Sequence, residues 1–176
     1  MSEFTGKRLL ALDLHPLSVG FAAFEGSDEL LDWGRIAARH GGKPVRVPLD
    51  AKLALLFDKC SPDVVAIKAP RTSLSKRMLR TVVDLAHDRR IPTRLISTAS
   101  VRKAFPENNS NKYQIASAIA TRYPELSPRL GSRRKIWQAE KYSMSIFDAV
   151  ALGVTYFLQE VMSDTKKDIT LLALPH

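Results

Sequence analysis

The sequence has very little cysteine and no long uninterrupted apolar run. Cys60 is the single cysteine among 176 residues, so neither an intrachain disulfide nor a cysteine-rich zinc site can form. The apolar segment 146–158 is interrupted by Asp148, and it falls short of the ~20 residues that a membrane span requires. The first residues also lack the charged-then-apolar layout of a signal peptide. These absences predict a cytoplasmic protein without a membrane partner.

Internal repeats and low-complexity tracts are also absent, and the overall composition is ordinary. Hydrophobic residues make up 45% of the chain and charged residues 26%, which is typical of a globular protein. A chain of this length can bury one substantial core without disulfide support. We therefore expect a single domain over residues 1–176, in which residues 163–176 form a C-terminal tail.

Positive charge is the strongest global feature. Lysine and arginine number 27 against 18 acidic residues, which gives a net charge of +9. Such an excess favours a polyanionic partner such as nucleic acid, although a generic basic surface is the alternative. Clustering favours the first interpretation, because the basic residues gather in two short spans, Arg71, Lys76, Arg77 and Arg80 in one and Arg133 and Arg134 in the other.

The pattern of apolar residues in the first half predicts an α/β fold. Residues 7–14, 18–25 and 29–39 read as an antiparallel meander. A helix over 49–59, a buried strand over 64–67, a helix over 73–90 and a strand over 93–97 then alternate. Such alternation indicates a partly parallel sheet joined by crossover helices.

The second half reads as mostly helical. We expect a short helix within 97–106, a helix over 112–123 capped by Asn111, and a long helix from about residue 138 to 162. Residues 124–137 are rich in proline and basic side chains. The apolar stretch 169–174 could add an edge strand or stay loose.

Two carboxylates call for an explanation. Asp13 ends a buried strand, and Asp148 lies among apolar residues of the last helix. Small residues near Asp148 would let that helix pack closely enough to bring both acids together, and paired carboxylates can hold Mg²⁺. Two alternatives remain open, since Asp13 could cap its own turn and Asp148 could pair with a buried lysine or arginine.

Four segments together resemble the RuvC branch of the RNase H-like superfamily, the Holliday-junction resolvases and their relatives. They are LLALDLHPLSVGFAAFE, DVVAIK, VRKAFPENNSNKYQIASAIATRYPEL and SIFDAVALGVTYF, and the resemblance spans roughly residues 7–158. It implies a mixed five-stranded sheet flanked by helices and a structure-selective endonuclease scaffold of DNA recombination and repair. It also implies branched or duplex DNA as substrate and Mg²⁺ or Mn²⁺ as cofactor, and it leaves a homodimer open.

Carried over position by position, the resemblance makes Asp13 and Asp148 metal ligands and makes Lys103 and Lys112 DNA contacts. Three positions depart from the family pattern. Lys68 stands where the family has a Glu, Ser145 where the resolvases have another acid, and His15 where a Gly is usual.

The Lys68 departure puts metal-dependent cleavage in doubt. An ammonium would stand where a cation should bind, and one such contact at 4 Å is worth about 4 kcal/mol at an effective dielectric constant of 20. Glu140, two helical turns before Asp148, could supply a further acid, or it could be a solvated acid at the helix start. His15 could act as a ligand or proton carrier, although an exposed turn histidine is commoner.

We therefore expect a RuvC-like nucleic-acid-binding protein with an incomplete metal site built around Asp13, Asp148 and Lys68. The binding face would contain Lys68, Arg71, Lys76, Arg77, Arg80, Lys112, Arg133 and Arg134. One alternative is an active Mg²⁺- or Mn²⁺-dependent endonuclease that uses Asp13, Asp148 and Glu140. Another is a phosphotransferase of the actin and sugar-kinase type, which usually needs two such domains.

Overall fold

A mixed five-stranded sheet organises the fold. The computed structural model describes residues 6–37, 39–40, 43–44, 47–107, 111–131 and 143–172. The strand order in the sheet is β3-β2-β1-β6-β7, with β1 (Arg8–His15), β2 (Ser18–Glu25), β3 (Glu29–Ala37), β6 (Val64–Lys68) and β7 (Thr93–Ile96). The first three strands are antiparallel neighbours, whereas β6 is parallel to β1 and β7 is parallel to β6. The predicted meander and the predicted parallel strands are both confirmed.

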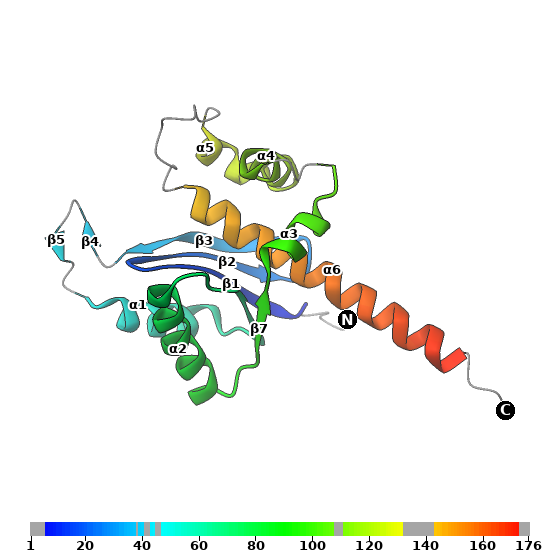
Figure 1. Ribbon diagram of the computed structural model, residues 1–176, viewed down its shortest axis with the longest axis horizontal. Coiled ribbons are helices and arrows are strands. Elements are labelled where there is room, and N and C mark those ends of the chain that lie inside the picture. Colours follow the sequence, from blue (N-terminus) through cyan, green and yellow to red (C-terminus); the bar gives the residue numbers. More distant parts are fainter. Residues whose placement is uncertain are drawn as a thin grey trace, which may run out of the picture.

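Helices cover both faces of this sheet (Figure 1). On one face lie α1 (Leu49–Cys60) and α2 (Ser73–Asp88), and on the other lies α6 (Met144–Leu172). The helices α3 (Thr98–Ala104) and α4 (Lys112–Arg122) pack against α6. The remaining elements are a small ribbon, β4 (Arg39–His40) with β5 (Lys43–Pro44), and two short helices after α4, η1 (Pro124–Leu126) and α5 (Ser127–Leu130).

The alternation of side chains along β1 separates two cores. Leu10 and Leu12 belong to the core under α1 and α2, whereas Leu9 and Ala11 belong to the core under α6. Because successive side chains of a strand point to opposite faces, Asp13 falls on the α6 face. The same alternation along β6 places Lys68 on that face as well, since Val64 and Ala66 belong to the α6 core.

Two glycines allow α6 to lie close to the sheet. A Cβ on Gly20 of β2 would overlap with the backbone oxygen of Ser145, and a Cβ on Gly153 of α6 would overlap with the ring of Phe24. The first turn of α6 therefore rests directly on β2. This confirms the expectation that small residues let the last helix approach the strands.

The C-terminal part of the chain differs from its sequence-based prediction. The stretch from residue 163 was expected to be a tail with an edge strand or no structure, but α6 continues through it to Leu172. Neither glycine nor proline occurs between Gly153 and Pro175, so nothing in the sequence ends the helix earlier. The predicted helix start at residue 138 lies outside the described residues.

By length and composition, one helix of the described chain is apolar enough to cross a membrane. This window is Met144–Asp164, with a mean hydropathy of 1.2, and 67% of it is buried inside the protein. Asp148 interrupts the apolar run, but the mean hydropathy of the helix is still high. The burial matches that of a core helix packed on a sheet.

Candidate functional site

Asp13 and Lys68 are neighbours at the carboxyl ends of two parallel strands. Leu12 of β1 pairs with Ile67 of β6 in the sheet register, so the next residue on each strand occupies adjacent positions. Lys68 Nζ lies 3.2 Å from Oδ1 of Asp13, whose side chain is 1% exposed. The buried carboxylate is thus neutralised by an ammonium from the neighbouring strand.

The start of α6 brings Asp148 to the same ammonium. Gly20, on which Ser145 packs, is the β2 partner of Asp13 in the sheet register. Asp148 lies three residues after Ser145 and therefore about one helical turn further on. Its Oδ2 is 3.3 Å from Lys68 Nζ. The first strand and the last helix meet as expected, and the two predicted acids contact one lysine.

Asp13 has a second partner on its own strand. His15 Nε2 lies 2.7 Å from Oδ2 of Asp13. Burial alone would raise the pKa of Asp13, but the hydrogen bond from His15 and the charge of Lys68 outweigh burial and hold that pKa below its usual value. The same hydrogen bond raises the pKa of His15. Asp13 is therefore a stable carboxylate, and His15 is biased toward its protonated form.

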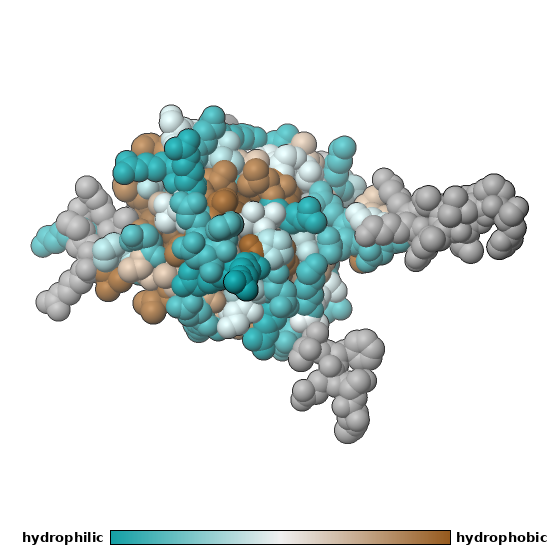
Figure 2. All heavy atoms as spheres, turned by 90° about the horizontal axis from the view of Figure 1, so that it is seen from below, coloured by the Kyte–Doolittle hydropathy of each residue, from teal (hydrophilic) through white to brown (hydrophobic). Residues whose placement is uncertain are grey.

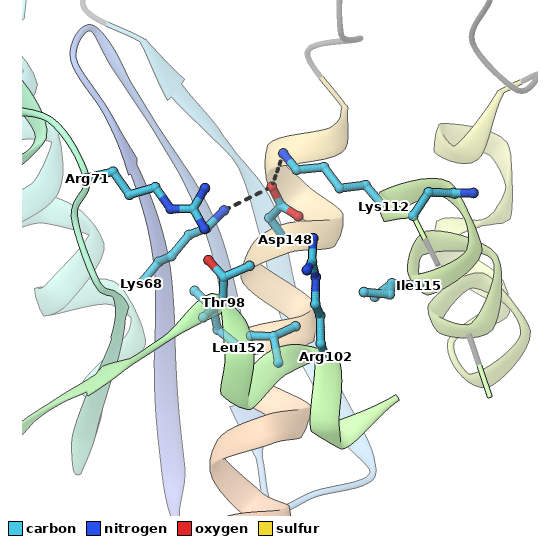
Figure 3. A pocket seen from close by; sticks show the side chains of 10 residues that line it. Lys68, Arg71, Thr98, Arg102, Lys112, Ile115, Asp148 and Leu152 are labelled. Atoms are coloured by element: carbon cyan, nitrogen blue, oxygen red, sulfur yellow. Dashed lines mark hydrogen bonds and ion pairs between the residues drawn. The ribbon is translucent and has the colours of Figure 1, made fainter. Parts of the chain in front are cut away.

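Lys112 adds a second ammonium at Asp148. It is the first residue of α4, and the preceding Asn111 caps this helix by accepting a hydrogen bond of 3.0 Å from the backbone N–H of Gln114. The predicted cap is confirmed. Lys112 Nζ lies 3.0 Å from Oδ2 of Asp148, the oxygen that Lys68 also contacts. Figure 3 shows the two lysines converging on Asp148 from different sides.

These contacts define the site's chemistry. Within the described residues, no group of three or more His, Cys, Asp or Glu side chains lies close enough to hold a metal ion. The two acids that do converge are contacted by Lys68, and Asp148 also by Lys112. The arrangement is an ion-pair network with one ammonium at its centre.

The predicted nucleic-acid contacts fall into separate groups. Arg71 lines a cavity together with Lys68 and Lys112. Lys103 of α3 lines a different cavity, between α3 and α6. Glu140, Arg133 and Arg134 lie outside the described residues.

Three further predicted contacts are exposed on α2. They are Lys76, Arg77 and Arg80, and α2 covers the sheet face opposite to α6. Figure 2 shows the molecule from that side, where the surface is largely hydrophilic with smaller hydrophobic areas between. The predicted contacts among the described residues therefore lie in more than one region, and three of them, Lys68, Arg71 and Lys112, line the cavity beside Asp148.

One charged residue that lines this cavity was not selected from the sequence as a site residue. Arg102 of α3 lines the cavity together with Thr98, four residues earlier. Side chains four residues apart share one helix face. The position of Arg102 one turn after the start of α3 is the signal that could have identified it.

Comparisons with known proteins agree with this architecture. No protein-family profile and no curated protein matches the sequence. Among solved structures, Thermus thermophilus RuvC matches with a TM-score of 0.64 and 15% identity, over 89% of this chain and 96% of that chain. The yeast mitochondrial Holliday junction resolvase Ydc2 matches with a TM-score of 0.67 and 12% identity, over 98% of this chain and 89% of that chain.

A third match is the complex of T. thermophilus RuvC with a Holliday junction substrate. Its TM-score is 0.62 at 15% identity, and it covers 88% of this chain and 96% of that chain. Identities this low establish the fold alone. The chain thus has the RuvC-type, RNase H-like fold and is a divergent example of it.

Proposed function

We propose that the protein is a RuvC-like, nucleic-acid-binding protein that acts on branched or duplex DNA and whose acidic metal site is incomplete. One observation carries this proposal. The ammonium of Lys68 lies between Asp13 and Asp148, 3.2 Å and 3.3 Å from their oxygens. A nuclease of this fold would need a divalent cation at such a pair of acids.

The residues of the site do not fit Mg²⁺ or Mn²⁺. Mg²⁺ is bound by carboxylates and retains several waters, and two-metal nucleases use several acids to hold two cations ~3.5 to 4 Å apart. Here two acids converge among the described residues, and the ammonium of Lys68 contacts both. We therefore assign the scaffold a binding role, without a metal-assisted step.

The charge of the protein supports a nucleic-acid ligand. The net charge is +9, and the cavity beside Asp148 is lined by Lys68, Arg71, Arg102 and Lys112. Contacts of lysine and arginine to phosphates supply most of the affinity of such proteins and little sequence preference. The complex of T. thermophilus RuvC with a Holliday junction substrate supports branched DNA as the ligand.

Binding of labelled four-way junctions and of duplexes of the same arm sequence, in EDTA, tests this proposal. We expect both to bind, and we expect the affinity to fall steeply as salt rises from 50 to 200 mM, because binding releases condensed counterions. Undetectable binding, or binding that added salt leaves unchanged, would overturn it.

The meeting of Asp13 and Asp148 also favours a second candidate, an active Mg²⁺- or Mn²⁺-dependent endonuclease. It predicts metal-dependent nicking of junctions that Asp13→Asn abolishes, with Glu140→Gln testing the third acid. The binding proposal predicts that the wild-type protein leaves junctions intact in 10 mM Mg²⁺ or Mn²⁺, while it still binds them.

A further inference from the structure

The cavity beside Asp148 carries far more positive than negative charge. Its volume is about 140 Å³, and its charged lining consists of Lys68, Arg71, Arg102, Lys112 and Asp148. The four cations come from the end of β6, the loop after it, α3 and the start of α4. Lys68 also contacts the buried Asp13, so among the described residues these four cations face two carboxylates, which leaves a surplus of two positive charges.

The two lysines share one acceptor in this cavity. Lys68 and Lys112 both contact Oδ2 of Asp148, at 3.3 Å and 3.0 Å. One oxygen thus serves two ammonium groups, each of which has three N–H donors. Lys68 also contacts Oδ1 of Asp13 at 3.2 Å, so two of its three N–H donors are used and one is left for a ligand in the cavity.

The two arginines add planar donors to the same space. Within the part of the chain that the structure describes, neither Arg71 nor Arg102 forms a salt bridge, and both are exposed. In Figure 3 the side chains of Arg71 and Arg102 lie on either side of the space in front of Asp148. Guanidinium groups bind phosphate through parallel N–H donors.

We infer that this cavity binds one phosphate group of a nucleic acid without a divalent cation. The phosphate oxygens accept from Arg71 and Arg102, and Lys68 keeps its contacts with Asp13 and Asp148 and donates its remaining N–H to the phosphate. The inference rests on the proposed function and deepens it. It assigns a phosphate-binding site, formed by lysine and arginine side chains, to the place where a nuclease would hold metal ions.

The phosphate can be an internal phosphodiester or a terminal phosphomonoester. A monoester carries a charge of about −1.5 to −2 at pH 7, which is closer to the surplus of two positive charges at the cavity. Both share the chemistry that the cavity recognises, so the experiment needs one arm for each source.

The experiment is isothermal titration in EDTA with three probes. These are inorganic phosphate, a short single-stranded oligonucleotide without terminal phosphate, and the same oligonucleotide with a 5′-phosphate. We expect Arg71→Gln/Arg102→Gln to weaken the preferred probe by about tenfold or more, as the loss of charge-assisted hydrogen bonds implies. Arg94→Gln, an exposed β7 arginine outside the cavity, is the matched control and should bind like the wild type.

A second variant tests whether Asp148 competes with the phosphate for the two lysines. Asp148→Asn removes the anion that competes for Lys68 and Lys112, so phosphate binding in EDTA should become tighter by several-fold. Unchanged or weaker phosphate binding by Asp148→Asn in EDTA would overturn the inference.

The outcomes separate this inference from the proposed function. Tighter binding of the 5′-phosphorylated oligonucleotide identifies a terminal monoester, and equal binding of both oligonucleotides identifies an internal diester. If the arginine double variant binds every probe and junction DNA as the wild type does, the phosphate-binding site is wrong while DNA binding stands. If phosphate binds and junction DNA does not, the proposed function is wrong instead.

Discussion

Lys68 Nζ lies 3.2 Å from Oδ1 of the buried Asp13, and this contact joins the carboxyl ends of two adjacent parallel strands. Because Asp13 is almost fully buried, its charge needs a partner inside the protein. Lys68 supplies that partner, and under the proposed function it takes the place of a divalent cation. A change of charge at Lys68 should therefore alter both the stability of the fold and the ion preference of the site.

Lys68→Glu should give the protein a divalent-cation site. The change removes the ammonium and brings a third carboxylate to Asp13 and Asp148, which is the oxygen-rich environment that Mg²⁺ and Mn²⁺ require. In EDTA the variant should be less stable than the wild type, because three acids then repel one another. At a Mn²⁺ concentration 100 times the dissociation constant, binding should add about 2.7 kcal/mol to the free energy of unfolding.

Thermal denaturation with and without Mn²⁺ measures this effect, and Lys76→Glu is the control. Lys76 is exposed on α2, so Lys76→Glu makes the same change of charge at a position away from the site. A melting temperature of Lys68→Glu that Mn²⁺ leaves unchanged would show that Lys68 does not stand at a latent metal site.

Lys68→Met should destabilise the protein by removing one partner of a buried ion pair. The expected loss in the free energy of unfolding at pH 7 is about 3 kcal/mol, at the lower end for such pairs, because Lys68 retains 23% exposure of its side chain. Urea denaturation measures it. The loss should shrink at pH 4, where Asp13, left with His15 as its partner, can take up a proton. Lys76→Met should stay within about 0.5 kcal/mol of the wild type.

The His15–Asp13 pair should make stability depend on pH. The pKa of His15 is raised by its hydrogen bond to Asp13, so its contribution is complete below about 6.5, the unfolded value, and is lost as pH rises through the folded value. The pKa of Asp13 is lowered, so its contribution is present above about 3.9 and is lost as pH falls through the folded value. Lys68 and Asp148 also act on His15, in opposite directions.

Urea denaturation between pH 5 and 8 should therefore show a fall in the free energy of unfolding toward pH 8. His15→Gln should flatten this part of the profile. His87→Gln, at a histidine whose side chain is 88% exposed, should leave it unchanged. A wild-type profile that rises steadily up to pH 8 would contradict the raised pKa of His15.

Gly20→Ala should displace the start of α6. Its Cβ would overlap with the backbone oxygen of Ser145, and overpacking of this kind costs about 1 to 3 kcal/mol. Because Asp148 lies one turn after Ser145, the shift should also loosen its contact with Lys68. Gly26→Asn is the control, at a position with open space and a φ of 68° that Asn tolerates. Equal stability of the two variants would contradict the close approach of α6.

Much of the fold could be predicted from local patterns in the sequence. The apolar runs of β1 and β6 define buried strands, and Asp13 at a strand end stands out because carboxylates are costly in a sheet core. Gly153 was one of the small residues expected to let the last helix pack closely, but the sequence did not identify what it or Gly20 contacts. Those contacts depend on how α6 crosses the sheet.

The details of the site depend on tertiary packing and were harder to predict. Lys68 was identified as a departure from the family's Glu. Its contacts with both Asp13 and Asp148 depend on the register between β1 and β6 and on the position of α6 on the sheet. Lys112 was predicted to contact DNA; its ion pair with Asp148 follows from the packing of α4 against α6 and could not be foreseen from the sequence. The end of α6 was missed because a short apolar stretch such as 169–174 fits a strand and a helix equally well.

The cap on α4 has a consequence for how the site is held together. Asn111 fixes the first turn of α4, and Lys112 follows it immediately, so the anchor point of one lysine is set by local backbone geometry. Lys68 is anchored just as firmly by the end of a central strand. A counterion tethered in this way cannot be chelated, diluted or exchanged, so the charge balance around Asp13 and Asp148 is independent of the divalent ions in the surrounding solution.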